Sequence, residues 1–302
     1  MSLSMFNTLR YYKLWFTISG LILAFGIVSL LMYGLRLGID FKGGALVELQ
    51  FEKAYDLTAV RGVLDKAGVK NYLLQSAENN GLIIKVEVLE KGKHDQLLND
   101  FKQKIGNFKE TRFDSIGPII GKELKRDAIY QLLLVSLGII LYIGYAFRKI
   151  AKPVTSWRFG CAAVIALFHD LLFVLGIFSL LGHFKGVEID SLFVTAMLTV
   201  LGFSVHDTIV VFDRIRENLK VYAGQSIDFV VNHSIAQTLV RSLNTSLTVL
   251  FVLLALLLFG GDTIRYFVFT LFIGIIVGTY SSIFIASPVL VLWQRWKTRK
   301  AY

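Results

Sequence analysis

Residues 191–212 read SLFVTAMLTVLGFSVHDTIVVF, an apolar stretch in which Asp207 is the one charged residue. About 20 helical residues cross the roughly 30 Å hydrocarbon core of a bilayer, so this stretch predicts a membrane-spanning helix that carries an acid. Five further stretches have the same apolar character, at 14–35, 128–147, 157–181, 243–259 and 266–292. The chain of 302 residues is 55% apolar and 18% charged, with a mean hydropathy of +0.61. This composition excludes a soluble protein and indicates an integral membrane protein with six spans.

The net charge of +10 belongs to the membrane part of the chain. Residues 36–127 hold 16 Lys/Arg and 14 Asp/Glu, whereas the remainder holds 16 Lys/Arg and 8 Asp/Glu. The short flanks on one side of the predicted spans carry 14 Lys/Arg, against Lys185 and Arg265 on the other. The positive-inside rule therefore predicts cytoplasmic termini and an external segment at 36–127. No basic patch interleaved with aromatic residues indicates nucleic-acid binding.

Residues 1–35 are predicted to form the N-terminus and an uncleaved first helix. The apolar run is too long for a signal peptide, and no small-residue cleavage pattern follows it. Cys161 is the single cysteine, which excludes an internal disulfide framework and a cysteine-based metal site. The sequence contains no Walker loop, catalytic triad or metal-ligand cluster, so we expect no enzymatic activity, no metal and no cofactor. Energy from ATP would have to come through a partner.

Residues 36–127 carry the patterning of a small soluble domain. Residues 45–51 alternate between apolar and polar side chains, which predicts a half-buried strand. Asp56 is a residue type that caps helices, and Gly68 is one that ends them, so a helix is predicted between them.

The rest of that segment predicts two hairpin strands, a helix and a last strand. Strands at 72–76 and 82–88 flank Asn79-Asn80-Gly81, a hairpin signal, and a helix at 94–105 precedes a strand at 108–116. The order β-α-β-β-α-β is that of a ferredoxin-like domain. The side chains expected in its core are Val47, Leu49, Phe51, Leu98, Phe101 and Ile105.

Two acids lie well inside predicted spans, Asp170 and Asp207, and each follows a histidine, His169 and His206. A charged residue at the centre of a span costs about 3 kcal/mol on insertion scales, so such residues face the bundle and are candidates for function. Both acids are candidate proton carriers, and the histidines are candidate relays near neutral pH. The alternatives are that the acids only hydrogen-bond neighbouring helices and that the histidines only pack.

Arg241 opens the fifth predicted span and is a candidate partner of Asp207. A helix motion that makes or breaks an ion pair between them would change the proton affinity of the carboxylate. The alternative is that Arg241 anchors its helix at the membrane surface. Such anchoring is also the plainer interpretation of the charged residues that follow the fourth span, Asp213, Arg214, Arg216 and Glu217.

Several motifs occur in chain order in a way that composition does not explain. They are GIDFKGG at 38–44, Gly117-Pro118, GKEL at 121–124, His169-Asp170, HDTIVVFDRIREN at 206–218, RSLNTS at 241–246 and LFGG at 258–261. Together they resemble the SecF family of protein-export membrane subunits, a branch of the resistance-nodulation-division superfamily. The residues that carry the family motifs include Asp40, Gly43, Gly44, Asp213 and Arg214.

The resemblance implies an accessory subunit of the Sec protein translocase in the bacterial inner membrane. It implies six helices and one periplasmic domain, with SecD as the partner of a heterodimer, the SecYEG channel and YajC as further partners, and unfolded exported polypeptide as the client. It also implies use of the proton-motive force late in export, with Asp207 and Arg241 in the proton pathway. One departure is His206, where the family pattern has Asn before the acid.

The segment 128–302 is then expected to hold five helices and a cytoplasmic amphipathic helix near 226–241 that leads into the fifth span. Two other functions stay open. A proton-driven exporter of small molecules or lipids in the same superfamily is disfavoured by the motif at 40–44 and by the small external domain. A scaffold without transport activity is disfavoured by Asp207.

Overall fold

The structure, a computed structural model, describes residues 8–69, 71–77, 79–86, 91–148 and 156–299. Two compact units make up the chain: residues 37–130 with 188–191, and residues 1–36, 131–187 and 192–302. The first unit begins one residue after the start of the predicted domain, 36–127, and continues to residue 130. It also includes residues 188–191, between the third and fourth spans.

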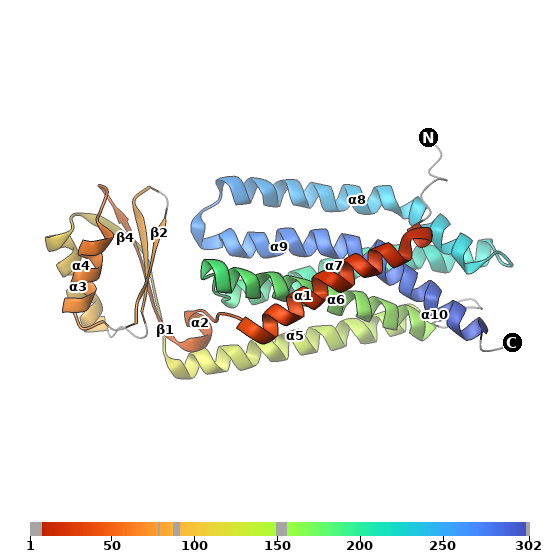
Figure 1. Ribbon diagram of the computed structural model, residues 1–302, viewed down its shortest axis with the longest axis horizontal. Helices are drawn as coiled ribbons and strands as arrows, with labels where there is room; N and C mark the ends of the chain where they lie inside the picture. The colour runs from red at the N-terminus through yellow and green to blue at the C-terminus, as the bar shows by residue number, and fades with distance from the viewer. Residues whose placement is uncertain (1–7, 70, 78, 87–90, 149–155, 300–302) are drawn as a thin grey trace. The chain divides into compact units, whose positions relative to one another are not determined.

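The smaller unit contains an antiparallel sheet with the strand order β2-β3-β1-β4. Two helices, α3 and α4, cover one face of this sheet (Figure 1). The elements are β1 Gly44–Phe51, α3 Leu57–Lys66, β2 Leu73–Ala77, β3 Gly81–Val86, α4 Lys91–Lys104 and β4 Phe108–Ile116. This order and pairing confirm the predicted ferredoxin-like domain.

Local signals in the sequence explain where these elements begin and end. Asp56 caps α3 by accepting a hydrogen bond of 2.9 Å from the Thr58 backbone N–H, and Gly68 follows the helix with φ of +70°. Asn79 and Asn80 have φ of 55° and 60° between β2 and β3, a conformation that Asn tolerates better than most residues.

The core of the domain follows the predicted periodicity. The apolar face of β1 and the Phe101 side chain of α4 are buried. Leu98 of α4 and Ile105, which directly follows α4, were also predicted in the core but are only partly buried. The buried set from the prediction is Val47, Leu49, Phe51 and Phe101.

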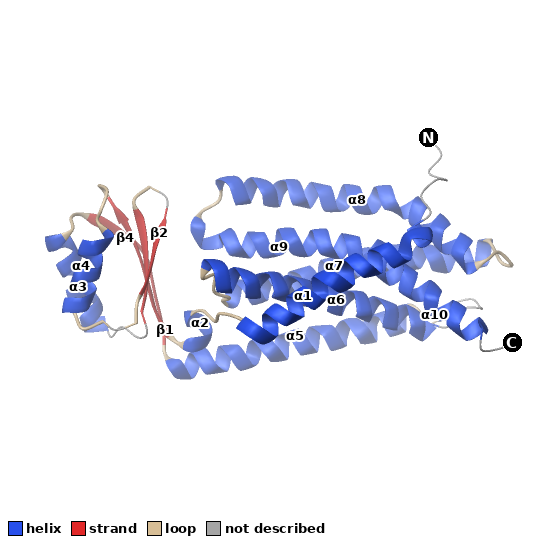
Figure 2. Cartoon of the chain, in the orientation of Figure 1, coloured by secondary structure: helices blue, strands red, loops and turns tan. Residues whose placement is uncertain are grey.

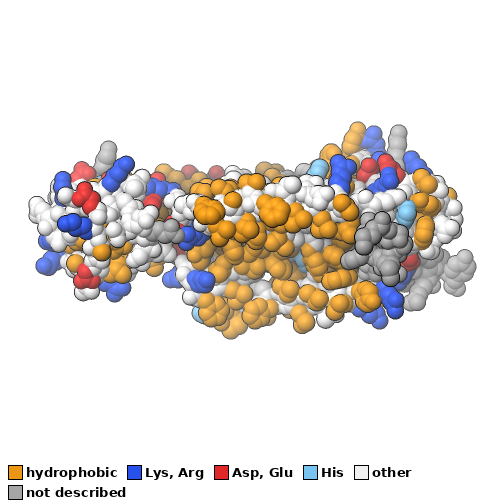
Figure 3. All heavy atoms as spheres, turned by 90° about the horizontal axis from the view of Figure 1, so that it is seen from above, with side chains coloured by type: hydrophobic (Ala, Val, Ile, Leu, Met, Phe, Trp, Pro, Cys, Tyr) orange, Lys and Arg blue, Asp and Glu red, His pale blue; other side chains and the backbone are white. Residues whose placement is uncertain are grey.

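The larger unit is helical (Figure 2), and the described residues contain six helical segments that are long and apolar enough to cross a membrane. The helices are α1 Tyr12–Tyr33, α5 Pro118–Ala146, α6 Ser156–Lys185, α7 Ser191–Val221, α8 Ile227–Phe259, α9 Asp262–Ser281 and α10 Ser287–Arg299. A π-helical turn, η3 Ser282–Ala286, joins α9 to α10, so together they form the sixth span. Hydrophobic side chains cover much of the visible face of this unit, and Lys and Arg gather towards its ends (Figure 3). The chain is a multi-pass membrane protein.

Helices α6, α7 and α9 form the centre of the helical unit. In the apolar stretches of α6, α7 and the sixth span, which includes α9, 44%, 56% and 61% of the residues are buried, against 11–17% in those of α1, α5 and α8. Gly26 of α1 and Gly176 of α6 let those two helices touch, because a Cβ at Gly176 would lie 2.6 Å from the Cα of Gly26. Gly274 and Gly278 of α9 pack against Val200 and Ser204 of α7. The GxxxG spacing in the last span therefore serves a contact within the bundle.

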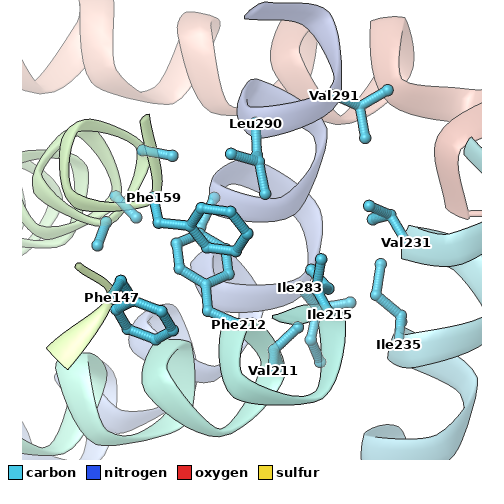
Figure 4. Close-up of a cluster of buried hydrophobic side chains, with 14 of the residues drawn as sticks. Phe147, Phe159, Val211, Phe212, Ile215, Val231, Ile235, Ile283, Leu290 and Val291 are labelled. Atoms are coloured by element: carbon cyan, nitrogen blue, oxygen red, sulfur yellow. The ribbon is translucent and has the colours of Figure 1, made fainter. Parts of the chain in front are cut away.

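A cluster of buried hydrophobic side chains lies between α6, α7, α8 and the segment formed by η3 and α10 (Figure 4). The rings of Phe147 and Phe159 stack with their centroids 5.4 Å apart, and Phe212 packs edge-on against Phe159 at 5.1 Å. Val231 and Ile235 of α8 point into the same cluster (Figure 4).

The segment predicted as an amphipathic helix near 226–241 forms the first part of α8, which continues without a break into the fifth span. Its apolar residues Val230, Val231 and Ile235 are buried against the bundle, whereas Val240 is exposed. An apolar stripe fits a bundle as well as a membrane surface, so the pattern alone did not distinguish the two.

Candidate functional site

Asp170 is at the centre of a hydrogen-bonded cluster between α6, α7 and α9. Its side chain is fully buried. The carboxylate Oδ1 lies 2.9 Å from Nδ1 of His169, and Oδ2 accepts hydrogen bonds from Ser204 Oγ at 2.5 Å and Ser281 Oγ at 2.8 Å. The cluster thus joins three central helices through one acid.

Asp207 forms a second polar contact, between α7 and α8. Its side chain is 6% exposed, and Oδ1 accepts a hydrogen bond of 2.5 Å from Ser242 Oγ. Oδ2 is buried and has no hydrogen-bond partner among the residues that the structure describes. A buried carboxylate oxygen without a partner costs free energy when it is charged, which makes Asp207 a group whose proton occupancy matters.

The structure does not bring Arg241 to Asp207. Arg241 is exposed on α8, and within the described residues its side chain makes no ion pair or hydrogen bond. Ser242, the next residue along, takes the position facing the acid. Successive residues of a helix point about 100° apart, so a residue that neighbours Ser242 in sequence faces elsewhere.

Two exposed polar stripes run along membrane-length helices. On α7 the stripe contains Thr195, Thr199 and His206, and on α8 it contains Arg241, Asn244 and Thr248. Two of the threonine hydroxyls donate to carbonyls of their own helix, Thr199 to Thr195 at 2.9 Å and Thr248 to Thr245 at 2.8 Å. The predicted relay His206 therefore lies on the outside of this chain, whereas His169 is buried at 5% exposure.

The hydroxyl partners of the two acids were not predicted. Thr208 and Ser282 form a further contact of 2.7 Å between α7 and η3, and Ser246 and Thr279 form one of 2.6 Å between α8 and α9. The sequence does contain a signal for these contacts, because Ser and Thr side chains within spans form hydrogen bonds between helices. The motif at 241–246 contains two of these hydroxyl residues, Ser242 and Ser246.

Among the charged residues after the fourth span, Arg214 links α7 to α8, and the others form pairs along α7. Arg214 Nε donates a hydrogen bond of 2.6 Å to Gln237 of α8, and its guanidinium pairs with Glu217 at 2.8 Å. Asp213 pairs with Arg216 at 2.6 Å. These contacts occur because α7 continues past the predicted end of its span, Phe212, to Val221.

The motif at 38–44 lies at the start of the smaller unit and includes the short helix α2 Ile39–Lys42. Gly43 has φ of +80°, and a Cβ there would lie 2.8 Å from the Cα of Pro118. Gly44 follows with φ of 147° and opens β1. The glycine pair is therefore required both by backbone conformation and by the close approach of α5.

Asp40, in the same motif, caps α7. Its Oδ2 accepts a hydrogen bond of 2.8 Å from the backbone N–H of Ser191, the first residue of that helix. A parallel bridge between Leu37 and Ile189 and an ion pair of 2.8 Å between Lys85 and Glu188 tie the same short segment to the domain.

Replacing Asp40 with Ala is expected to cost about 1 kcal/mol, the usual value of a lost helix cap, and to loosen the first turn of α7. Asp40→Asn keeps an acceptor oxygen and should lose less. Amide hydrogen exchange at residues 191–194 measures the effect. Equal protection in Asp40→Ala and the wild type would show that the contact does not hold α7.

The described residues contain no group of three or more His, Cys, Asp or Glu side chains placed to hold a metal ion. The arrangement offers two buried carboxylates, one buried imidazole and a set of interhelical hydroxyls. Such groups bind and pass protons. Fold and site together define a multi-pass membrane protein with ionisable groups inside its helical bundle and one ferredoxin-like domain.

Comparison with known proteins identifies the family. The model of the C-terminal region of the protein export membrane proteins SecD/SecF matches residues 96–296, and the SecD/SecF GG motif matches residues 28–54. The chain belongs to the SecD/SecF family of protein-export membrane proteins. Its GG motif is the segment in which Asp40 caps α7 and Gly43 contacts α5.

Relatives named protein translocase subunit SecF match over nearly their whole length. One from Thermobaculum terrenum is 49% identical, and one from Anaerolinea thermophila is 40% identical; each alignment covers 96% of this chain and 94% of the relative. The crystal structure of SecDF, a translocon-associated membrane protein from Thermus thermophilus, superposes with a TM-score of 0.83 at 35% identity. That match covers 96% of this chain but 39% of the SecDF chain.

Proposed function

We propose that the chain is an accessory subunit of the bacterial Sec protein translocase, which uses the proton-motive force to promote late steps in the export of unfolded polypeptides. Membership of the SecD/SecF family supports the translocase part of this proposal. The observation that carries the proton-driven part is Asp207, a buried acid with one unpartnered oxygen in the middle of a spanning helix. The protein has no enzymatic activity of its own in this proposal.

Asp207 binds and releases the transported proton, and Arg241 acts on it from the neighbouring helix. In the described arrangement Ser242 holds the carboxylate at 2.5 Å, and Arg241 is one residue away on another face of α8. Rotation of α8 by about 100° would exchange the two, because that is the angle between successive helical residues. Exchange of a hydroxyl for a guanidinium would change the proton affinity of Asp207 and so drive release.

A SecD-type subunit covers the polar stripes of α7 and α8. His206, Arg241 and Asn244 are exposed on helices of membrane length, and polar side chains in spans face protein or water rather than lipid. The solved SecDF chain is more than twice as long as the part that this chain matches, which leaves room for such a partner. The SecYEG channel and YajC are the further partners in this proposal.

In this proposal the chain lies in the inner membrane, with both termini in the cytoplasm and the ferredoxin-like domain in the periplasm. Reporters fused after Lys220 and after Arg299 are therefore expected to report cytoplasm, and one inserted near Asn80 periplasm, as the 14-to-2 distribution of basic residues requires. Paired phosphatase and fluorescent-protein fusions make this measurement. A cytoplasmic signal from the Asn80 insertion would reverse the orientation.

The experiment that tests the function is export of a client protein into inverted membrane vesicles. Vesicles depleted of this chain should translocate less client, and restoring the chain with its SecD-type partner should recover the missing fraction. That fraction should disappear when an ionophore collapses the proton gradient, while translocation driven by ATP alone persists. Restoration that is insensitive to the ionophore would favour a scaffold, and no restoration would exclude a role in export.

A further inference from the structure

The cluster around Asp170 contains a pair of ionisable groups that the proposed proton pathway does not use. His169 and Asp170 are adjacent on α6, and both are buried, at 5% and 0% exposure. Nδ1 of the imidazole lies 2.9 Å from Oδ1 of the carboxylate, so the ring is oriented by the acid. The other carboxylate oxygen accepts hydrogen bonds from Ser204 and Ser281, so three donors surround one acid.

His169 has a second ring nitrogen, Nε2, on the side away from Asp170. When Nδ1 donates its hydrogen to the charged Asp170 carboxylate, the neutral ring carries its lone pair on Nε2. Nε2 is buried and has no hydrogen-bond partner within the described parts of the chain. A proton that binds there leaves its donor, hydronium or another acid, as the N–H bond forms, and the imidazolium is then neutralised by the carboxylate beside it.

Within the described residues, two neighbouring helices carry ionisable groups that are linked to this pair. Helix α9 contributes Tyr280, whose ring centroid lies 6.3 Å from that of His169 and whose hydroxyl is 3.0 Å from Ser19 Oγ of α1. Helix α7 contributes Asp207, which is three residues, or about 4.5 Å of helix rise, beyond Ser204. Asp207 is therefore the acid through which α7 can influence the pair.

We propose that His169 and Asp170 form a second proton-binding site and that its proton occupancy is coupled to that of Asp207. Asp170 accepts a hydrogen bond from Ser204, which lies three residues before Asp207 on α7, so a change in the charge of either buried carboxylate acts on the same stretch of α7 and the two acids titrate as a coupled system. This inference rests on the proposed function in one respect, that Asp207 binds protons.

The second site also has a route to the rest of the bundle. Ser281, which donates to Asp170, directly precedes the π-helical turn η3, and Ser282 within that turn contacts Thr208, the residue after Asp207. Turns of this kind occur frequently at functional sites. A change in the charge of Asp170 alters the strength of the hydrogen bond that it accepts from Ser281. The protonation of Asp170 therefore acts on η3, the turn between α9 and α10.

The test is an infrared pH titration of the full chain reconstituted in lipid vesicles. Asp170→Asn is expected to remove one pH-dependent carboxyl band, and His169→Gln to remove the imidazole signal that changes with it. Asp207→Asn should shift the pH at which the Asp170 band changes. Ser179→Ala is the matched control, because Ser179 is buried on α6 but bonds Ser29 of α1 at 2.8 Å, away from both acids.

Coupling is overturned if the Asp170 band changes at the same pH in the wild type and in Asp207→Asn. The second site itself is overturned if Asp170→Asn removes no pH-dependent band. Ser204→Ala keeps both acids and should shift the Asp170 titration even if Asp170→Asn fails to fold; an unchanged titration there also counts against the inference.

Failure of the function and failure of the inference are distinguishable. If Asp207→Asn keeps full ionophore-sensitive export, the proposed role of Asp207 is lost whatever the infrared bands show. If Asp207→Asn abolishes that export but leaves the Asp170 titration unmoved, only the coupling is lost.

Discussion

Asp207→Asn is expected to abolish the part of client export that depends on the proton gradient. Asn preserves the size of the side chain and an acceptor for Ser242, so the bundle should insert and bind its partner as before. It cannot bind and release a proton, so the ionophore should have no further effect on vesicles that carry this variant. Translocation driven by ATP alone should continue at its own rate.

The measurement is the ionophore-sensitive fraction of export at matched amounts of each variant. Asp228→Asn is the control, since Asp228 is an acid of the same helical unit that pairs with Arg295 at the exposed start of α8. Full ionophore sensitivity in Asp207→Asn would make Asp207 a hydrogen-bonding residue and would transfer the proton route to Asp170 or to the partner.

Arg241 provides a graded version of the same experiment. Arg241→Lys keeps the positive charge but loses the planar guanidinium, so it should be milder than Arg241→Met if charge is what acts on Asp207. Equal loss in both variants would indicate that the geometry of the guanidinium matters, for instance in contact with the SecD-type subunit.

Phe101→Ala is expected to produce the largest loss of stability in the ferredoxin-like domain. Phe101 is fully buried between α4 and the sheet, and truncating a buried Phe typically costs about 3–5 kcal/mol. Small domains have net stabilities of roughly 5–15 kcal/mol, so much of the domain's stability would be removed. Amide hydrogen exchange in β1 and α4 of the membrane-inserted chain should rise accordingly.

Lys102→Ala is the control for that experiment, because the neighbouring side chain is exposed on the same helix and should change stability by less than about 0.5 kcal/mol. Equal exchange in the two variants would mean that Phe101 does not hold the domain together.

The sequence was most informative where structure depends on local pattern. Apolar stretches predicted the six spans, and alternation predicted β1 and its buried face. Asp56, Gly68 and the Asn79-Asn80 pair marked ends and turns because capping and positive φ depend on the residue itself.

Features set by packing between helices could not be predicted in the same way. Which side of α8 faces Asp207 depends on helix rotation, and a one-residue difference exchanges Ser242 for Arg241. The apolar stripe of residues 226–241 is compatible with a membrane surface and with the bundle, and only the contacts of Val231 and Ile235 decide between them. The cap that Asp40 provides to α7 joins residues 151 positions apart, which no local pattern reveals.

Proton flux into vesicles measures whether this chain carries protons through Asp207. The chain is reconstituted with its SecD-type partner, a pH-sensitive dye is enclosed, and a proton gradient and membrane potential are imposed. We expect an inward flux that is lost in Asp207→Asn and retained in Asp228→Asn. Equal flux in the wild type and Asp207→Asn would contradict this expectation.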